Sequence, residues 1–186
     1  MTGLTRRQLA ILITMLAAGG SLSAADPARP QVGMEAHDFE LSDLGGTKHQ
    51  LATAVKDGPV VLIVLRGYPG YQCPVCTKQV GQFLAAADKF QAKGARVLLV
   101  YPGPSKELPK HAADFVSGKT IPAGFHLLLD PDFTFTNAYG LRWEAPNETA
   151  YPSTFVIGKD RKVTFAKISK GHGDRSSVEE VLKALP

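Results

Sequence analysis

The stretch that organises this chain is Arg66-Gly67-Tyr68-Pro69-Gly70-Tyr71-Gln72-Cys73-Pro74-Val75-Cys76-Thr77-Lys78-Gln79, which holds both of its cysteines. The preceding run, 59–65, is continuously apolar and rich in β-branched residues, which is typical of a strand buried on both faces. The following segment, 77–91, has apolar residues at helical spacing. The two cysteines are therefore expected where a buried strand turns into a helix.

This placement favours reactive cysteines. The unpaired backbone N–H groups and the dipole at a helix N-terminus stabilise a thiolate, the form that attacks disulfides and peroxides. We therefore interpret Cys73 and Cys76 as a redox pair that forms a redox-active disulfide. A purely structural disulfide closing so small a loop would restrict the unfolded chain little. A zinc site needs four ligands at short spacings, and no metal is expected because the histidines are scattered singly: His37, His49, His111, His126 and His172.

Length and charge limit the function classes. The 186 residues suffice for one domain with a substantial core. The formal charge of +4 falls to +2 if residues 1–25 are removed, because that segment holds two arginines and no acid. The sequence has no basic run or RNA-binding signature, so nucleic acid is not an expected partner.

The N-terminus is typical of an export signal. Residues 1–25 combine the basic pair Arg6-Arg7, a short apolar segment at 9–18 and small residues before Asp26. The arginine pair is also compatible with twin-arginine export. We expect a cleaved signal peptide and a periplasmic or otherwise exported protein without a membrane anchor, in an oxidising compartment. An uncleaved membrane anchor is the alternative. The predicted linker is 26–34, and the predicted redox domain is 35–186.

The order of elements predicts the fold class. A hairpin around Gly45-Gly46 opens the domain, strand–helix–strand–helix–strand follows, and a second hairpin and a last helix close it. With Cys-x-x-Cys after the first buried strand, this is an α/β, thioredoxin-like order, with a mixed central sheet and helices on both faces. The predicted strands are 38–42, 48–51, 59–65, 95–101, 125–129, 153–157 and 162–166. The predicted helices are 77–91, 106–117 capped by Ser105, 133–139, and 178–185 capped by Ser176-Ser177.

At these residues the chain resembles the alkyl hydroperoxide reductase/thiol-specific antioxidant family, the peroxiredoxins and their relatives, over roughly residues 32–185. Peroxiredoxins carry Pro-x-x-x-Thr-x-x-Cys. Here Pro69 opens the same frame, Cys76 closes it, Thr77 follows, and Cys73 occupies the threonine position. The resemblance implies that Pro69 and Thr77 support the site. Further matching segments are Phe39-Glu40-Leu41, Leu128-Leu129-Asp130-Pro131, Tyr139-Gly140 and Ser153-Thr154-Phe155-Val156-Ile157.

Two departures from that family are informative. Gln79 stands where many members have glutamate, and Pro152 stands where peroxiredoxins have an arginine over the thiolate. The segment from Pro152 to Phe155 instead resembles the Pro-x-Thr-Phe of extracytoplasmic thiol–disulfide reductases. That resemblance implies a catalytic Pro152 with a cis peptide bond facing the cysteines. A proline that merely opens a strand is the alternative.

Other residues could support or border the site. Arg66 and Arg142 are the cations nearest to it in the sequence. Each could stabilise a thiolate, or could be an ordinary solvated or salt-bridged surface residue. Trp143 could line a substrate groove with Tyr68 and Tyr71, and core packing is the equal alternative for Trp143.

The sequence thus predicts a thiol-dependent oxidoreductase with no bound cofactor, restored by an external thiol reductant. In the first hypothesis Cys73 attacks a protein disulfide and Cys76 resolves the intermediate. In the second, Cys76 reduces hydroperoxides as an antioxidant peroxidase. The missing arginine and threonine should slow that reaction. A metal-binding or redox-sensing module is a remote third.

Overall fold

The computed structural model of the chain describes residues 29–186, so the predicted signal peptide, 1–25, lies outside the described residues. Its centre is a five-stranded sheet with the strand order β5-β4-β3-β6-β7. β3 is parallel to β4 and β4 to β5, whereas β6 is antiparallel to both β3 and β7. The predicted mixed sheet is therefore confirmed. The strands are β3 (Val60–Val64), β4 (Arg96–Gly103), β5 (Phe125–Pro131), β6 (Ser153–Ile157) and β7 (Val163–Ile168).

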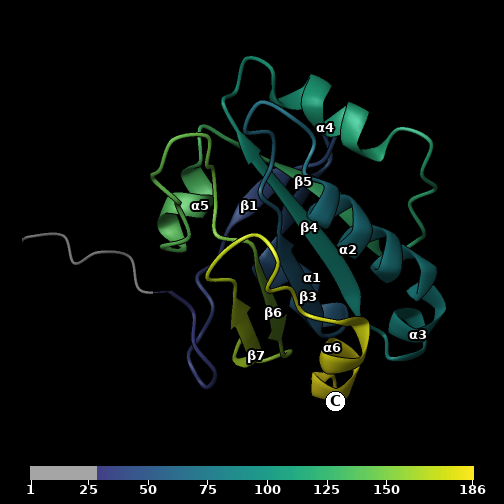
Figure 1. Cartoon of the computed structure of the whole chain (residues 1–186). Coiled ribbons are helices and arrows are strands. Elements are labelled where there is room, and N and C mark those ends of the chain that lie inside the picture. Colours follow the sequence, from purple (N-terminus) through teal and green to yellow (C-terminus); the bar gives the residue numbers. More distant parts are fainter. Residues whose placement is uncertain (1–28) are drawn as a thin grey trace, which may run out of the picture.

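Helices cover both faces of this sheet, as the sequence predicts (Figure 1). One face carries α2 (Pro74–Ala85), α3 (Ala87–Ala92), α4 (Leu108–Val116) and α6 (Val178–Ala184). The other face carries α1 (Leu51–Asp57) and α5 (Thr134–Ala138). Because side chains alternate along each strand, Val61 and Ile63 enter the first core and Val60 and Leu62 enter the second.

The predicted opening hairpin is formed by β1 (Glu40–Ser42) and β2 (Lys48–Gln50), which pair in antiparallel fashion. An isolated bridge between Asp43 and Leu128 connects the end of β1 to β5. The predicted strand 48–51 is one residue too long, because Leu51 starts α1. The sequence analysis missed α1 altogether.

Two predicted helices have different boundaries in the structure. The predicted helix 77–91 begins earlier, at Pro74, because proline suits the first position of a helix, and it breaks at Ala86 into α2 and α3. The prediction that Ser105 caps the next helix is wrong. Glu107 is the N-cap of α4, and the Ser105 N–H instead donates to Asp132 at 2.9 Å.

The described part of the predicted linker, 29–34, contacts the domain. The Gly33 N–H donates to the Val163 carbonyl, and the Val163 N–H donates to the Met34 carbonyl, each at 2.9 Å. Within residues 29–186, no helix has the length and apolar character required to cross a membrane.

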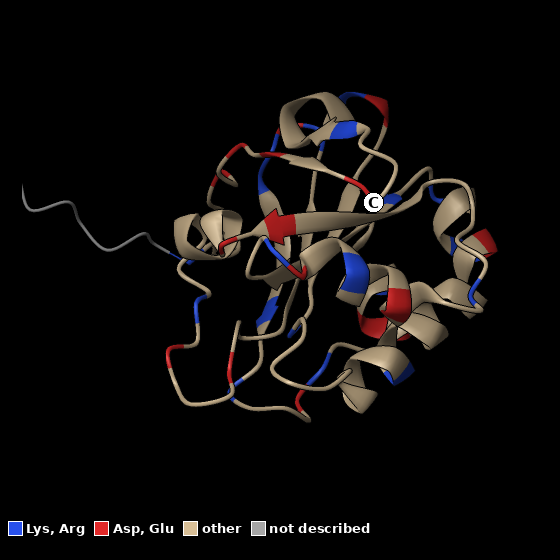
Figure 2. Ribbon diagram, turned by 90° about the horizontal axis from the view of Figure 1, so that it is seen from above, with Lys and Arg blue, Asp and Glu red and all other residues tan. Residues whose placement is uncertain are grey.

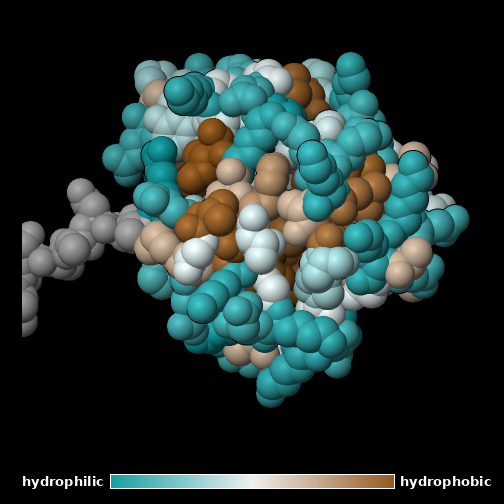
Figure 3. Space-filling model, turned by 90° about the horizontal axis from the view of Figure 1, so that it is seen from below, coloured by the Kyte–Doolittle hydropathy of each residue, from teal (hydrophilic) through white to brown (hydrophobic). Residues whose placement is uncertain are grey.

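Figure 2 shows basic and acidic residues interspersed along the ribbon, with neither sign gathered on one side. Figure 3 views the molecule from below and shows apolar side chains in the middle of that face, surrounded by hydrophilic ones.

Candidate active site

The site is a turn at the carboxyl ends of β3 and β4, where the chain leaves the sheet and enters α2. The Leu65 N–H donates to the Val100 carbonyl at 2.9 Å, which extends the pairing of β3 with β4 up to the turn. Gly67 then adopts a φ of +70°, and a Cβ there would lie 2.0 Å from the Pro102 carbonyl oxygen. Only glycine tolerates both conditions, so the sequence forces a sharp turn directly before the cysteines.

The two cysteines are unbonded, and both are buried, with exposed fractions of 2% for Cys73 and 1% for Cys76. Cys73 is the more exposed of the two, although only by a narrow margin. Cys73 is the N-cap of α2, and its Sγ accepts the Cys76 N–H at 3.3 Å. The Cys76 Sγ accepts the Arg66 backbone N–H at 3.5 Å. Each sulfur is thus held by a backbone donor at the strand-to-helix turn.

The surroundings shift the pKa values of the two thiols in opposite directions. The pKa of Cys73 is lowered to about 5, chiefly because the Cys76 thiol donates a hydrogen bond to the Cys73 sulfur. Burial opposes this shift, while the Cys76 backbone N–H and the charges of Arg175 and Arg66 favour it. The same side-chain hydrogen bond, with burial, raises the pKa of Cys76. The hydrogen bond between the two sulfurs therefore favours the thiolate at Cys73 and the protonated thiol at Cys76.

Arg175 is the cation nearest to the sulfurs, and the sequence analysis missed it. Its Nη2 lies 3.6 Å from the Cys76 Sγ and 4.0 Å from the Cys73 Sγ. Its Nη1 is buried and has no hydrogen-bond partner among the described residues. Arg175 comes from the loop before α6, about 100 positions from the cysteines, so only the fold brings it there.

Two sets of hydrogen bonds hold the loop that carries Arg175. The Arg175 Nε donates to the His172 carbonyl at 2.9 Å. Ser177 caps α6 and forms a capping box with Glu180, which confirms the predicted cap. The short helix therefore anchors the segment that carries Arg175.

The predicted supporting cation Arg66 is buried, and its guanidinium has its hydrogen-bond partners outside the cysteine pair. Its Nε and Nη2 form a bidentate pair with Glu148 at 2.6 and 2.9 Å, and its Nη1 donates to the Tyr71 hydroxyl at 2.7 Å. Burial would raise the pKa of Glu148, but hydrogen bonds from Arg66 and His172 lower it overall. Arg66 reaches the site through its backbone N–H and, at longer range, through its charge.

The other predicted supporting residues have structural contacts. Arg142 donates from Nη1 to the Trp143 carbonyl at 2.8 Å and also to the Thr149 carbonyl, so it organises the intervening loop. Thr77 donates its Oγ1 to the Cys73 carbonyl at 3.2 Å, within the first turn of α2. Pro69 is half-buried in the turn before the cysteines.

Pro152 opens β6 and is buried. Its neighbour Ser153 pairs with Val64, the last residue of β3, so Pro152 lies at the same end of the sheet as the cysteine turn. Residues 29–186 contain no cis peptide bond, so the prediction of a cis Tyr151–Pro152 bond is wrong. The Pro152 carbonyl accepts the Ser169 N–H at 2.9 Å and thereby continues the pairing of β6 with β7.

The aromatic residues expected to line one groove have separate partners. Trp143 stacks on Tyr151 with ring centroids 4.8 Å apart, and Tyr68 stacks on His111 at 3.6 Å. Tyr71 is exposed and lies against the Arg66 guanidinium. A cavity of about 230 Å³ lies between α2 and the loop that carries Arg175. It is lined by Val75, Lys78, Gln79, Gln82, Gly173, Arg175, Ser176 and Ser177.

Comparisons with known proteins agree with this geometry. The AhpC/TSA family model matches residues 32–166. Mycobacterium tuberculosis Rv1608c, which is named as a peroxiredoxin, is 33% identical over 129 residues, covering 68% of this chain and 77% of the relative. The thiol-disulfide oxidoreductase ResA of Geobacillus thermodenitrificans is 27% identical over 186 residues, covering 98% of this chain and 95% of the relative.

A solved structure extends the likeness to the fold. The crystal structure of the peroxidoxin BcpB from Mycobacterium tuberculosis superposes with a TM-score of 0.68 and 27% identity, covering 84% of this chain and 97% of that one. The family match spans the cysteine turn, Pro152 and the central sheet up to residue 166, within β7. The chain therefore belongs to the AhpC/TSA family within the thioredoxin-like proteins and is a thiol-dependent oxidoreductase.

Proposed function

We propose that the protein is an exported thiol–disulfide oxidoreductase in which Cys73 is the nucleophile and Cys76 resolves the intermediate. The observation that carries this proposal is the opposite electrostatic setting of the two sulfurs, with the pKa of Cys73 lowered to about 5 and that of Cys76 raised. A thiolate attacks disulfides, whereas a thiol does not. The likeness to ResA over nearly the whole chain supports the same substrate class.

The reaction would proceed in two exchanges. The Cys73 thiolate attacks one sulfur of a substrate disulfide, forms a mixed disulfide and releases the other substrate sulfur as a thiolate. Cys76 then loses its proton to solvent or to the released thiolate and attacks the Cys73 sulfur. This step forms the Cys73–Cys76 disulfide and releases the second substrate sulfur, so two electrons pass to the substrate. An external thiol reductant restores the dithiol.

The arrangement of charges gives this order a physical reason. While Cys73 is a thiolate, it holds the proton of Cys76 through their hydrogen bond. Once Cys73 is part of a mixed disulfide, its negative charge is gone and this hydrogen bond no longer favours the protonated form of Cys76. The Arg175 guanidinium, 3.6 Å from the Cys76 Sγ, then favours the Cys76 thiolate. Resolution is thus promoted by the first exchange.

Peroxide reduction through Cys76 is the second candidate, and Arg175 is the observation that favours it. Peroxide reduction benefits from a positioned cation. In this chain Pro152 occupies the position at which peroxiredoxins have an arginine, so that cation is missing there. Arg175 brings a guanidinium with a free buried Nη1 to the Cys76 sulfur from another part of the chain. The raised pKa of Cys76 disfavours this candidate, because the attacking thiolate would be scarce.

Export is part of the proposal and rests on the predicted signal at 1–25 and the predicted cleavage before Asp26. We expect mature protein recovered from the exported fraction to begin near Asp26. Mass spectrometry of the intact protein measures this directly. Exported protein that retained Met1 would overturn cleavage without affecting the proposed chemistry.

Serine variants test which cysteine attacks. Cys76→Ser should accumulate a mixed disulfide on Cys73 with a protein disulfide substrate, because the resolving thiol is missing. Cys73→Ser should be nearly inert toward the same substrate. If Cys73→Ser instead forms a sulfenic acid on Cys76 at micromolar peroxide while Cys76→Ser traps nothing, the protein is a peroxidase.

A further inference from the structure

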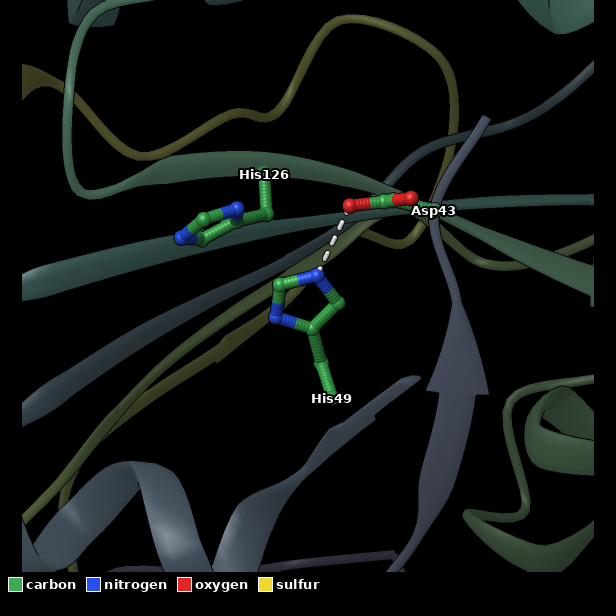
Figure 4. Close-up of side chains that lie close together, drawn as sticks. All are labelled: Asp43, His49 and His126. Carbon is green, nitrogen blue, oxygen red and sulfur yellow. Dashed lines mark hydrogen bonds and ion pairs between the residues drawn. The ribbon is translucent and has the colours of Figure 1, made fainter. Parts of the chain in front are cut away.

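A second polar cluster lies away from the cysteines, between the opening hairpin and the edge strand β5. It consists of Asp43, His49 and His126 (Figure 4). Asp43 follows β1, His49 is the middle residue of β2, and His126 lies near the start of β5. The cysteine chemistry uses none of them. His49 and His126 are scattered singly in the sequence, and the fold brings them together.

We propose that Asp43, His49 and His126 bind a divalent transition-metal ion such as Zn²⁺. One ligand atom from each residue lies within 4.8 Å of the other two. Two imidazoles and a carboxylate, without a thiolate, are a donor set suited to zinc and its neighbours in the first transition row. Three protein ligands leave one tetrahedral position for water or an external ligand.

The contacts of Asp43 position its carboxylate for this role. Its Oδ1 accepts the N–H groups of Gly45 and Thr47, each at 2.9 Å. Its Oδ2 is directed at the His49 Nε2, 2.9 Å away. Hydrogen bonds to the atoms that do not face the ion commonly orient the ligands of metal sites. One oxygen is thus held by the turn while the other is presented to the imidazoles.

The two imidazoles lie against each other. Their ring centroids are 4.3 Å apart at an interplanar angle of 42°, and the Asp43 carboxylate lies beside both rings (Figure 4). Around zinc at ordinary bond lengths, tetrahedral ligand atoms lie ~3.3 Å apart. The Asp43 Oδ2 and the His49 Nε2, 2.9 Å apart, must therefore separate slightly and lose the proton between them. The remaining ligand atoms must approach one another by at most ~1.5 Å.

The backbone around the cluster is fixed from two sides. His49 pairs with Leu41 in the hairpin, and His126 pairs with Leu98 in the central sheet. The bridge from Asp43 to Leu128 joins the two parts two residues from His126. A bound ion would therefore fasten the hairpin to the sheet and should stabilise the folded state.

The cluster is also open to a cation. A hollow of about 210 Å³ is lined by Asp43 and His126, with Leu44, Gly45, Val116, Ile121, Phe125 and Leu127. The positive charge that acts on His126 and would repel a bound cation is that of Arg96. Its Nη2 is paired with the Asp57 carboxylate at 2.5 Å. Its charge is thus partly neutralised where it would otherwise repel the ion.

The test must exclude the cysteines, because thiolates bind zinc and copper strongly. Isothermal titration of full-length Cys73→Ser/Cys76→Ser protein with Zn²⁺ should give one bound ion per chain. A thermal melt of the same protein with Zn²⁺ should show a higher melting temperature than without it. His126→Ala should weaken the binding by more than ~100-fold, since removing even an outer partner of a metal ligand costs 10–100-fold. His37→Ala is the matched control, because His37 is an exposed histidine outside the cluster, and it should bind as tightly as the parent.

Copper provides a readout that reports the ligands directly, without a histidine substitution. The electron paramagnetic resonance spectrum of Cu²⁺ bound to the cysteine-free protein should show coupling to two imidazole nitrogens. One-nitrogen coupling, unchanged affinity in His126→Ala, or the absence of zinc binding at millimolar concentration would each overturn the proposal. Equal binding of Mg²⁺ would also overturn it, because hard cations prefer all-oxygen sites.

Discussion

The two polar clusters of this domain are complementary in charge. At the cysteine turn, backbone N–H groups and the guanidinium of Arg175 surround two sulfurs, so the site stabilises an anion. At the hairpin, the carboxylate of Asp43 lies against the imidazoles of His49 and His126, so the cluster can hold a cation once the proton between Asp43 and His49 is released. The comparison teaches that similar polar content can serve opposite chemistry, depending on whether donors or acceptors converge.

The most drastic way to separate the two regions is to remove the nucleophile. Cys73→Ser should lower disulfide reductase activity by ~10³-fold or more, since loss of a nucleophile removes the covalent route. The double variant Cys73→Ser/Cys76→Ser should still bind zinc at the hairpin cluster. Steady-state turnover of Cys73→Ser and zinc titration of the double variant check the two expectations. Substantial remaining turnover would assign the attack to another group.

The second test concerns the ion pair under the cysteine turn. Glu148→Gln should lower the free energy of unfolding by ~3 kcal/mol, because it leaves the buried Arg66 guanidinium without its counter-charge. Urea denaturation measures this. Glu144→Gln, on the exposed part of the same loop, is the matched control and should change stability little.

The pH dependence of that pair follows from the lowered pKa of Glu148. The contribution to stability is complete above the pKa of an unfolded glutamate, about 4.3, and is lost as the pH falls through the lower folded value. The difference in stability between wild type and Glu148→Gln should therefore shrink below about pH 4. A difference that grew on acidification would contradict this sign.

Arg175 distinguishes the two candidate reactions. Arg175→Met keeps the apolar length and should raise the pKa of Cys73, because a nearby positive charge is lost, and should slow disulfide exchange a few-fold below pH 6. If peroxide reduction were the main activity, the same change should cost it about 10²-fold or more, because a positioned charge would be lost. Stopped-flow rates with both substrates measure the contrast. Lys170→Met, exposed on the same loop, serves as the control.

The smallest expected effect is at the base of the loop that carries Arg175. Ser177→Ala removes the side chain that caps α6 and should cost ~1 kcal/mol of stability. Ser105→Ala should cost almost nothing, since Ser105 is not the N-cap of α4. Thermal melts of the two variants compare them. Equal destabilisation would mean that the capping box adds nothing.

The centre of the sheet was predictable because β3 and most of β4 are continuous apolar runs, and each strand of the sheet lies close to its predicted range. The helix α1 was missed although Leu51, Ala54 and Val55 have helical spacing, because it occupies only 7 residues directly after a strand. The start of α2 was misplaced because Pro74 was not recognised as its first residue. Local signals of this kind are in the sequence and can be found.

The rest of both sites depends on tertiary structure. Cys73 and Cys76 are neighbours along the chain, so their spacing alone indicated a site. Arg175 and His126 reach their clusters from distant segments, and nothing adjacent to them in the sequence marks either residue. Burial likewise could not be predicted for Cys73, because the surrounding loops decide whether an N-cap residue is covered.

The central claim is that Cys73 is the thiolate in the reduced protein. The direct measurement is the rate of alkylation by iodoacetamide from pH 4 to pH 9, with the modified cysteine identified by peptide mass spectrometry. We expect modification at Cys73 with a midpoint near pH 5, set by its lowered pKa. Modification of Cys76 first, or a midpoint near the free-thiol value of about 8.5, would contradict the account.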